Sequence, residues 1–228
     1  MGAHVLKRIA LALLCVLPSL AAHAADVEMG TVTLKLTLPP GQCDFDPSQA
    51  ADKRIIEASK AAAPGNDMLE MSADCTELRD WRAGRRPLLE HMAQYQTLRT
   101  VRTAPFTTSD AAAACAQMRA KGDQVNADLL PSIKENVSKA MKDVQLQGQT
   151  FLGVAGEDPN GCYVTFLQKF KAETGKNITQ LNMFFMGSIK DRLLYIYLIT
   201  PYVDDSTLPQ LLALQKANTA ALKAANGL

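Results

Sequence analysis

The sequence predicts an α+β domain, with a largely antiparallel β-sheet flanked by helices and two disulfides. Three observations lead to this prediction. Between residues 150 and 200, short runs of aromatic, β-branched and other apolar residues are separated by short polar turns, which is the pattern of a strand meander. Between residues 125 and 144, apolar residues recur every four positions, as in an amphipathic helix. Four of the five cysteines follow the N-terminal apolar segment, and this even number suits two disulfides.

The N-terminal segment 1–24 is predicted to be a secretory signal peptide. Lys7 and Arg8 form a basic head, an apolar run follows at 9–20, and Ala22-His23-Ala24 fits a small-x-small cleavage site. The apolar run is too short to serve as a membrane anchor. We therefore expect a periplasmic or secreted protein whose mature chain, 25–228, forms a single domain with no integral membrane segment.

The charge balance of the mature chain narrows its class of partners. The full sequence has 24 Lys and Arg residues against 23 Asp and Glu residues, and cleavage would remove two of the basic ones, Lys7 and Arg8. A chain so close to neutral argues against a nucleic-acid-binding protein and against one held to anionic lipid by bulk charge.

The mature cysteines are Cys43, Cys75, Cys115 and Cys162. Three pairings are possible, and we favour Cys43 with Cys75 and Cys115 with Cys162 because each pair joins consecutive segments. Each bridge would contribute about 3–4 kcal/mol, mainly by restricting the unfolded chain. A zinc site is disfavoured because no two of these cysteines have the close spacing of metal knuckles.

The first part of the mature chain is predicted to contain a strand and a helix. Residues 31–38 alternate between apolar and polar, which indicates a half-buried strand, and the prolines that follow end it. We expect Asp46 to cap a helix that runs to about Ala62 and buries Ile55 and Ile56.

The middle of the chain is predicted to contain two strands and then two helices. Residues 68–73 form a short strand candidate, and 88–98 fits either a strand or a helix, with a strand favoured. An alanine-rich helix is expected at 109–122. A second helix is expected at 125–144, where Pro131 makes its first turn or kinks it.

The last part is predicted to be an antiparallel meander followed by a helix. The last strand, 193–200, is apolar on both faces, so we place it at the centre of the sheet. Asp205 or Ser206 should begin a helix whose leucines pack on the sheet. The preceding strands are expected at 150–154, 162–170 and 178–186, with turns at 158–161, 175–177 and 187–191.

The sequence contains no motif that identifies a reaction. After the leader only one histidine remains, His91, so a His-rich metal centre is excluded and a His-dependent nucleophile would have to use this residue. Three acid pairs could act as acid and base or bind a hard cation, but each lies where turns and helix starts favour acids in any case. These pairs are Asp44 with Asp46, Glu157 with Asp158, and Asp204 with Asp205. We expect no catalytic residue, no metal ligand and no cofactor.

The most concentrated polar cluster surrounds the only tryptophan. Arginine presents a planar fork to carboxylates or phosphates and stacks on aromatic rings, so the cluster is a candidate contact surface for a protein partner or a small anionic ligand. The alternative is a solvated loop in which Glu77 and Asp80 balance part of the charge. The candidate residues are Arg79, Trp81, Arg82, Arg85 and Arg86.

A second candidate surface is formed by the aromatic residues of the meander. At strand spacing such residues usually pack in the core, and we favour that interpretation, although tyrosine hydroxyls could line a pocket. The set comprises Tyr163, Phe166, Phe170, Phe184, Phe185, Tyr195, Tyr197 and Tyr202.

Two short segments carry a family resemblance. The first strand ends in Leu38-Pro39-Pro40-Gly41, and the last runs into Thr200-Pro201-Tyr202, an acidic cap and a leucine-rich helix. The chain resembles uncharacterised exported bacterial proteins, and its arrangement is similar to the PsbP-like fold of extrinsic photosystem subunits and bacterial lipoproteins. It departs from that pattern in its four mature cysteines and its long helical middle. The resemblance implies an antiparallel sheet between helices and a non-enzymatic role in binding or assembly.

The sequence thus predicts an exported, non-enzymatic binding or accessory protein. Two alternatives stay open. One is an exported hydrolase that uses carboxylates or His91, and the other is a structural envelope protein.

Overall fold

The computed structural model describes residues 23–141 and 144–228. Its strands are β1 His23–Met29, β2 Val32–Thr37, β3 Gln42–Asp44, β4 Asn66–Asp74, β5 Met92–Leu98, β6 Val144–Asp158, β7 Gly161–Ala172, β8 Asn177–Ile189 and β9 Arg192–Pro201. Its helices are α1 Ala50–Ala62, α2 Cys75–Arg82, α3 Thr108–Ala140 and α4 Thr207–Ala225, with a 3₁₀ turn at Arg99–Val101. None of the helices in these ranges is long and apolar enough to cross a bilayer.

Most of the predicted signal peptide, residues 1–22, lies outside the described residues. Strand β1 begins at His23, two residues before the predicted cleavage site. The pairing of β1 with β2 continues from Ala25 opposite Leu36 to Met29 opposite Val32, so this part of the hairpin belongs to the predicted mature chain.

The predicted α+β class is confirmed. Seven strands form one antiparallel sheet in the order β3-β4-β5-β9-β8-β7-β6, and β1 with β2 forms a separate hairpin. Strands β6 to β9 are neighbours in chain order, as predicted for a meander. Strand β9 lies between β5 and β8 at the centre of the sheet, because its side chains are apolar on both faces and need cover on both.

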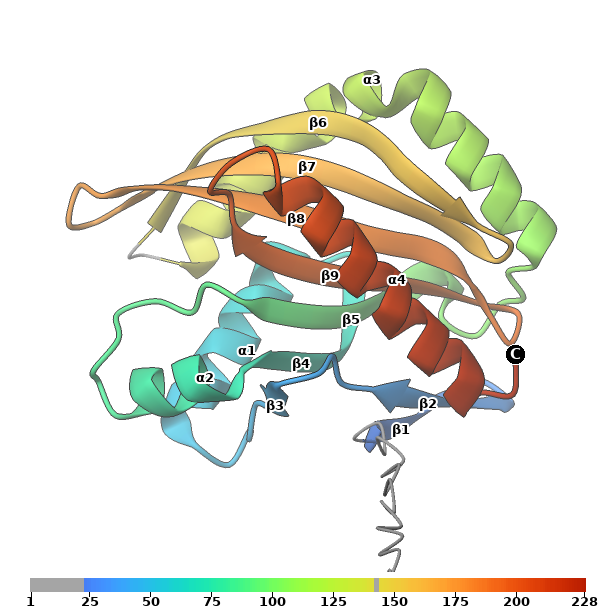
Figure 1. The fold of residues 1–228 in the computed structure, drawn as a ribbon, viewed down its shortest axis with the longest axis horizontal. Coiled ribbons are helices and arrows are strands. Elements are labelled where there is room, and N and C mark those ends of the chain that lie inside the picture. The colour runs from blue at the N-terminus through green and yellow to red at the C-terminus, as the bar shows by residue number, and fades with distance from the viewer. Residues whose placement is uncertain (1–22, 142–143) are drawn as a thin grey trace, which may run out of the picture.

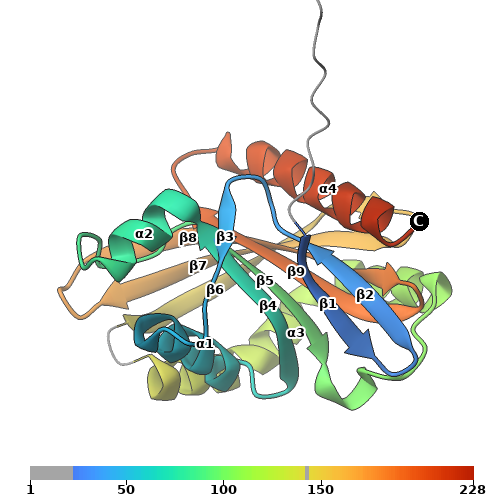
Figure 2. The same cartoon turned by 90° about the horizontal axis from the view of Figure 1, so that it is seen from below.

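Helices cover both faces of the sheet. Helix α4 crosses one face, where the β1–β2 hairpin also packs, and α1 with part of α3 lies on the other face (Figures 1 and 2). Leu211 and Leu222 of α4 are buried in the same core cluster as Leu194 and Ile196 of β9, which confirms the predicted packing of the last helix on the sheet. The core is therefore divided by the sheet into an α4 side and an α1/α3 side.

The turn between β8 and β9 is shorter than the sequence predicts. The predicted turn at 187–191 is only the pair Lys190 and Asp191, both with positive φ (49° and 55°), the conformation that two-residue hairpin turns favour. Gly187 instead lies inside β8. A glycine is needed there because a Cβ would lie 2.4 Å from the Asn160 carbonyl oxygen. The glycine serves close packing rather than a turn.

The two helices predicted over 109–144 are one helix. Helix α3 begins with a capping box between Thr107 and Asp110, continues through Gly122 and Pro131, and ends at Ala140. Gly122 does not end the helix, because its missing side chain makes room for the ring of Phe151, whose Cζ would lie 2.2 Å from a Cβ. The helix bends over β6 and reaches α1 (Figure 1), so packing maintains it past the glycine and the proline.

The first helix also differs from its prediction at both the cap and the buried face. Helix α1 begins at Ala50, and Asp46 instead closes the preceding turn by accepting the Ser48 N–H at 2.9 Å. Ile55 and Ile56 are half-buried, while Asp52 is fully buried. A buried carboxylate on this helix face requires a partner, which lies in α2.

Candidate functional site

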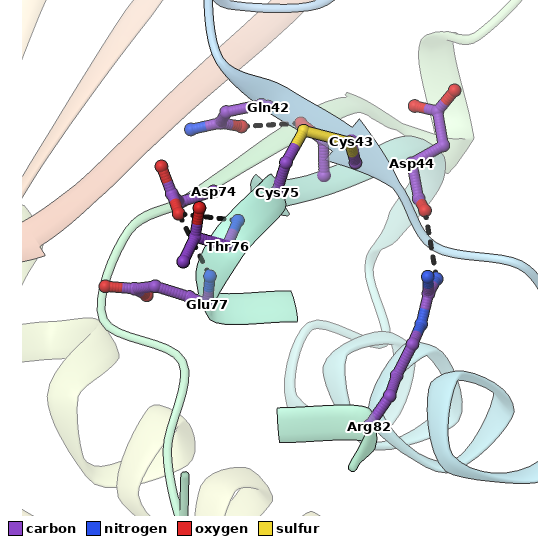
Figure 3. The surroundings of a disulfide bond; sticks show 9 residues. Gln42, Cys43, Asp44, Asp74, Cys75, Thr76, Glu77 and Arg82 are labelled. Carbon is purple, nitrogen blue, oxygen red and sulfur yellow. Dashed lines mark hydrogen bonds between the residues drawn. A yellow bond between two sulfur atoms is a disulfide. The ribbon is translucent and has the colours of Figure 1, made fainter. Parts of the chain in front are cut away.

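Both predicted disulfides are present. Cys43 is joined to Cys75, and Cys115 to Cys162. The first bridge fixes the start of α2 beside β3, and Asp74 caps this short helix by accepting the N–H groups of Thr76 and Glu77 at 2.9 and 3.0 Å (Figure 3). The segment that carries the predicted arginine cluster is thus anchored at its beginning.

Arg82 is the partner of the buried Asp52. Its Nε donates to Asp52 Oδ1 at 3.0 Å, and a terminal nitrogen donates to Asp52 Oδ2 in a bidentate pair. The same terminal nitrogen donates to the Asp44 carbonyl at 3.2 Å, while the Asp44 carboxylate points away from it (Figure 3). Since the guanidinium is occupied by these acceptors, Arg82 joins α1, α2 and β3 and is not free for a ligand.

Arg86 is similarly used within the loop after α2. It donates to the Leu88 carbonyl at 2.8 Å and pairs with Glu90 and Glu77. Glu77, nearly buried, also accepts the N–H groups of Glu90 and His91 at 2.8 and 3.0 Å. Burial alone would raise the pKa of Glu77, but the bonds from His91 and from these N–H groups lower it. The predicted strand at 88–98 therefore begins only at Met92, because side chains hold the residues before it as a loop.

Three residues of the predicted cluster remain on the surface. The side chains of Arg79 and Arg85 are 67% and 61% exposed, and both contact Asp80, at 3.5 and 2.6 Å. Trp81 is half-buried against a small core that includes Leu78. The five predicted residues thus do not converge on one anion site. Arg79, Trp81 and Arg85, which we call the Trp81 surface, are the part that a partner could touch.

His91 is oriented by a carboxylate, as a catalytic base would be, but it has no nucleophilic side chain as a hydrogen-bond partner among the described residues. Its Nδ1 lies 2.8 Å from Glu77 Oε1, and its side chain is 49% exposed. Among the hydrogen bonds of the described residues, none joins His91 to a serine, threonine or cysteine side chain. The same ranges contain no group of three or more His, Cys, Asp or Glu side chains that could hold a metal ion.

The acid pairs considered for acid–base chemistry have separate local partners. Asp46 closes a turn, and hydrogen bonds from Ser48 lower its pKa. Asp204 accepts the Ser206 N–H at 2.8 Å before α4. Asp158 pairs with Lys223 at 2.8 Å. Turn, capping and ion-pair chemistry accounts for these acids.

Asp44 is the exception among these acids, and it gives a stability prediction. Its Oδ1 is buried without a hydrogen-bond partner, and burial raises its pKa above 3.8. Burial, together with the charge of Asp44, also raises the pKa of Glu70. Because burial disfavours the charged form, Asp44→Asn, which removes that charge, should stabilise the protein at pH 7 by less than about 1 kcal/mol, since the side chain is only half-buried. Urea unfolding measures the difference.

The pH dependence of that gain follows from the direction of the shift. A carboxyl whose folded pKa is raised destabilises the fold above that folded pKa, and the penalty disappears as pH falls below the unfolded value. The advantage of Asp44→Asn should therefore shrink as pH falls from 7 toward 4. An advantage that grew on acidification would contradict the burial argument. Asp46→Asn is the matched control and should destabilise slightly, because the pKa of Asp46 is lowered.

The sheet divides the predicted aromatic set between its two faces. Tyr163 and Phe185 are buried on the α4 side, which confirms the core interpretation for them. Phe184, Tyr195 and Tyr197 lie on the α1/α3 side, together with Phe166. The remaining two, Phe170 and Tyr202, are half-buried and belong to neither group of close ring pairs.

Solvent reaches the middle of the sheet on the α1/α3 side. On the central strand β9, Leu194, Ile196 and Leu198 are at most 1% exposed, whereas Tyr195, Tyr197 and Ile199 between them are only half-buried. Strand β5 shows the same contrast in part: Ala93, Tyr95 and Thr97 are fully buried and Met92, Gln94 and Leu98 are half-buried, but Gln96, on the same side as these three, is buried as well. The α4 side is sealed at these positions, and the opposite side is not.

We call the open part of this side the aromatic face. Strand pairing places Gln94 beside Tyr197 and Tyr197 beside Phe184 in one row, with Asn182 beside Ile199 in the next. The Phe184 ring lies 5.0 Å from that of Tyr197 and 5.8 Å from that of Tyr195. The aromatic face comprises Gln94, Asn182, Phe184, Tyr195, Tyr197 and Ile199.

Several polar atoms of the aromatic face lack protein partners. Asn182 Oδ1 is buried without a hydrogen bond, although its amide nitrogen reaches Gln168 at 3.4 Å. Among the side-chain hydrogen bonds of the described residues, none involves the hydroxyl of Tyr195 or Tyr197. Burial raises the pKa of both tyrosines, so they stay protonated at physiological pH. The face thus combines an apolar aromatic surface with a few uncharged hydrogen-bonding groups.

Comparison with models of known families and with curated proteins finds no match to this chain. The fold and these two surfaces define a disulfide-bonded α+β domain with a half-open aromatic face.

Proposed function

We propose that the protein is an exported, non-enzymatic binding protein whose ligand lies on the aromatic face. The half-open centre of the sheet is the observation that carries this proposal. Ligand sites are typically apolar and aromatic surfaces with a small number of placed polar groups. The apolar, aromatic surface is supplied by Phe184, Tyr195 and Tyr197, and the polar groups are supplied by Gln94 and Asn182.

Export is supported by two independent features. Disulfides persist in oxidising compartments, and both bridges of this domain are formed. The predicted leader supplies the route. An antiparallel sheet between helices is the arrangement that the proposed PsbP-like relationship implies, and members of that family act mostly by binding or assembly.

A binding role is favoured over hydrolysis by the way the chemical groups are used. His91, the single histidine of the predicted mature chain, forms a hydrogen bond with Glu77. Glu77 in turn accepts the Glu90 N–H of the loop that follows α2. Arg82 and Arg86 are engaged in ion pairs that join structural elements. These groups maintain the fold around the site rather than converge on a reacting atom.

The Trp81 surface supports a second candidate function, that of an accessory protein docking on a protein partner. Arg79 and Arg85 are exposed, and the loop between Arg82 and Met92 is fixed by Glu77 and Arg86. A rigid surface loses little conformational entropy on docking, which favours such a contact.

Native mass spectrometry of protein purified from the exported compartment tests the proposal. The mass should correspond to a chain beginning at Ala25, lowered by about 4 Da for two disulfides. It should also include a non-covalent adduct that survives Arg85→Ala and is lost in Tyr197→Ala. An adduct lost only in Arg85→Ala would favour the Trp81 surface. Turnover that disappears in His91→Ala would overturn the binding role.

A further inference from the structure

We infer that the aromatic face takes an uncharged molecule with a flat ring and at least one hydrogen-bond donor. This inference rests on the proposed function and names the chemical class of its ligand. It depends on three observations about this side of the sheet: the absence of formal charge, the arrangement of the rings and the unpaired acceptor of Asn182.

The sheet carries no formal charge toward the aromatic face. Successive side chains of a strand alternate between faces, and the pairing of β5, β9, β8 and β7 is regular here. On these four strands every residue on the α1/α3 side is apolar, aromatic or an uncharged polar residue. The charged residues Lys169, Lys171 and Arg192 alternate onto the α4 side. A charged group placed against this part of the sheet would lose water and gain no counter-ion from it.

The ring arrangement favours a flat ligand. Phe184 meets Tyr195 edge-on, with an interplanar angle of 73°, and stacks on Phe166 at 11° with centroids 5.9 Å apart. The half-buried rings of Tyr195 and Tyr197 continue this group to β9. Aromatic rings pair favourably in stacked and edge-to-face geometry, so a further ring can extend the group.

The polar atoms favour a ligand that donates a hydrogen bond. Asn182 Oδ1 can only accept, and it is buried without a partner. Gln94 Oε1 already accepts from Gln96 at 2.7 Å, while the two tyrosine hydroxyls can donate or accept. Protein atoms cover Asn182 Oδ1, so a ligand N–H or O–H reaches it only when the Asn182 side chain turns toward the open face, and that contact would remove the penalty of a buried, unpaired acceptor.

Two dyes with the same rings separate charge from shape. N-phenyl-1-naphthylamine is uncharged and carries an N–H, and 8-anilino-1-naphthalenesulfonate has the same ring system with one added sulfonate. On the unaltered protein we expect saturable fluorescence enhancement with the neutral dye and at least tenfold weaker binding of the sulfonate.

A charge placed on the face supplies the matched variant. Gln94→Glu keeps the acceptor that Gln96 uses and adds one carboxylate, so the neutral dye should bind about tenfold more weakly. Gln147→Glu makes the same change at an exposed position of β6 and should leave binding unchanged. Because the two-dye comparison uses the unaltered protein, it decides the ligand class even where a variant fails to fold.

The outcomes separate this inference from the proposed function. Equal binding of the two dyes, or neutral-dye binding that is unchanged in a folded Gln94→Glu variant, would overturn the inferred class and leave a binding role standing. Absence of binding by either dye would overturn both the inference and the proposed site. Preference for the neutral dye that is lost in Gln94→Glu supports both.

Discussion

Replacing Asp52 with alanine should lower the free energy of unfolding by about 3–5 kcal/mol, the usual effect of breaking a buried ion pair. Asp52 is 0% exposed, and it receives both fork nitrogens of Arg82. Its removal would leave a guanidinium between α1, α2 and β3 without its counter-ion. Equilibrium urea unfolding, with the slope of the transition compared between variants, measures the change.

The exposed arginines provide the matched control for this prediction. Arg79→Ala and Arg85→Ala remove the same side chain from the surface of the same segment, and each should change stability by less than about 1 kcal/mol. Arg82→Ala should resemble Asp52→Ala, and the double variant should lose much less than the sum of the two. A comparable loss in Arg79→Ala, or additive losses at 52 and 82, would contradict the structural role of this pair.

The Arg82 pair also shows which contact of the arginine cluster the local sequence does not reveal. The sequence does not distinguish the buried arginine near Trp81 from the exposed ones. The partner of Arg82, Asp52, lies 30 residues earlier on another helix. The acids that pair with Arg85 and Arg86 lie close in sequence, at Asp80, Glu77 and Glu90, and the local charge pattern identifies the first two. Local charge counting identifies the surface trio but not the buried pair.

The strand pattern was more informative, because it has direct consequences for burial. The double-sided apolar character of 193–200 places β9 at the centre of the sheet, since only a covered strand tolerates it. Short turns, of two residues at 159–160 and 190–191 and of four residues at 173–176, force consecutive strands to pair, which fixes the meander. Consecutive segments also bring Cys43 to Cys75 and Cys115 to Cys162.

Two features depended on packing that no local pattern records. A glycine near the end of a helical pattern often marks the end of the helix. At Gly122, however, the ring of Phe151 occupies the space that a side chain would fill, and the helix continues. The aromatic face has the same limitation. The alternation along β9 shows that Tyr195 and Tyr197 share a side, but not that the helices on that side leave them half-open.

Removing the Cys115–Cys162 bridge should have an effect as large as breaking the buried ion pair. The bridge joins α3 to β7 across 47 residues of sequence, and the loss of that constraint on the unfolded chain corresponds to about 4 kcal/mol. Both cysteines are almost completely buried. A Cys115→Ala/Cys162→Ala variant should therefore unfold at much lower urea, and α3 should detach from β6 before the rest of the domain, as hydrogen exchange would show.

The two bridges should also differ in their resistance to reduction under native conditions. Cys43 and Cys75 are half-buried, so a reductant can reach them in the folded protein, whereas access to Cys115 and Cys162 requires opening between α3 and β7. Thiol alkylation followed by mass spectrometry should therefore detect Cys43 and Cys75 first, with Cys115 and Cys162 appearing only as the protein unfolds. The reverse order would mean that α3 separates from the sheet in the native state. In that case the aromatic face would be a transiently exposed core, and dye binding at equilibrium would rise with the population of the open state.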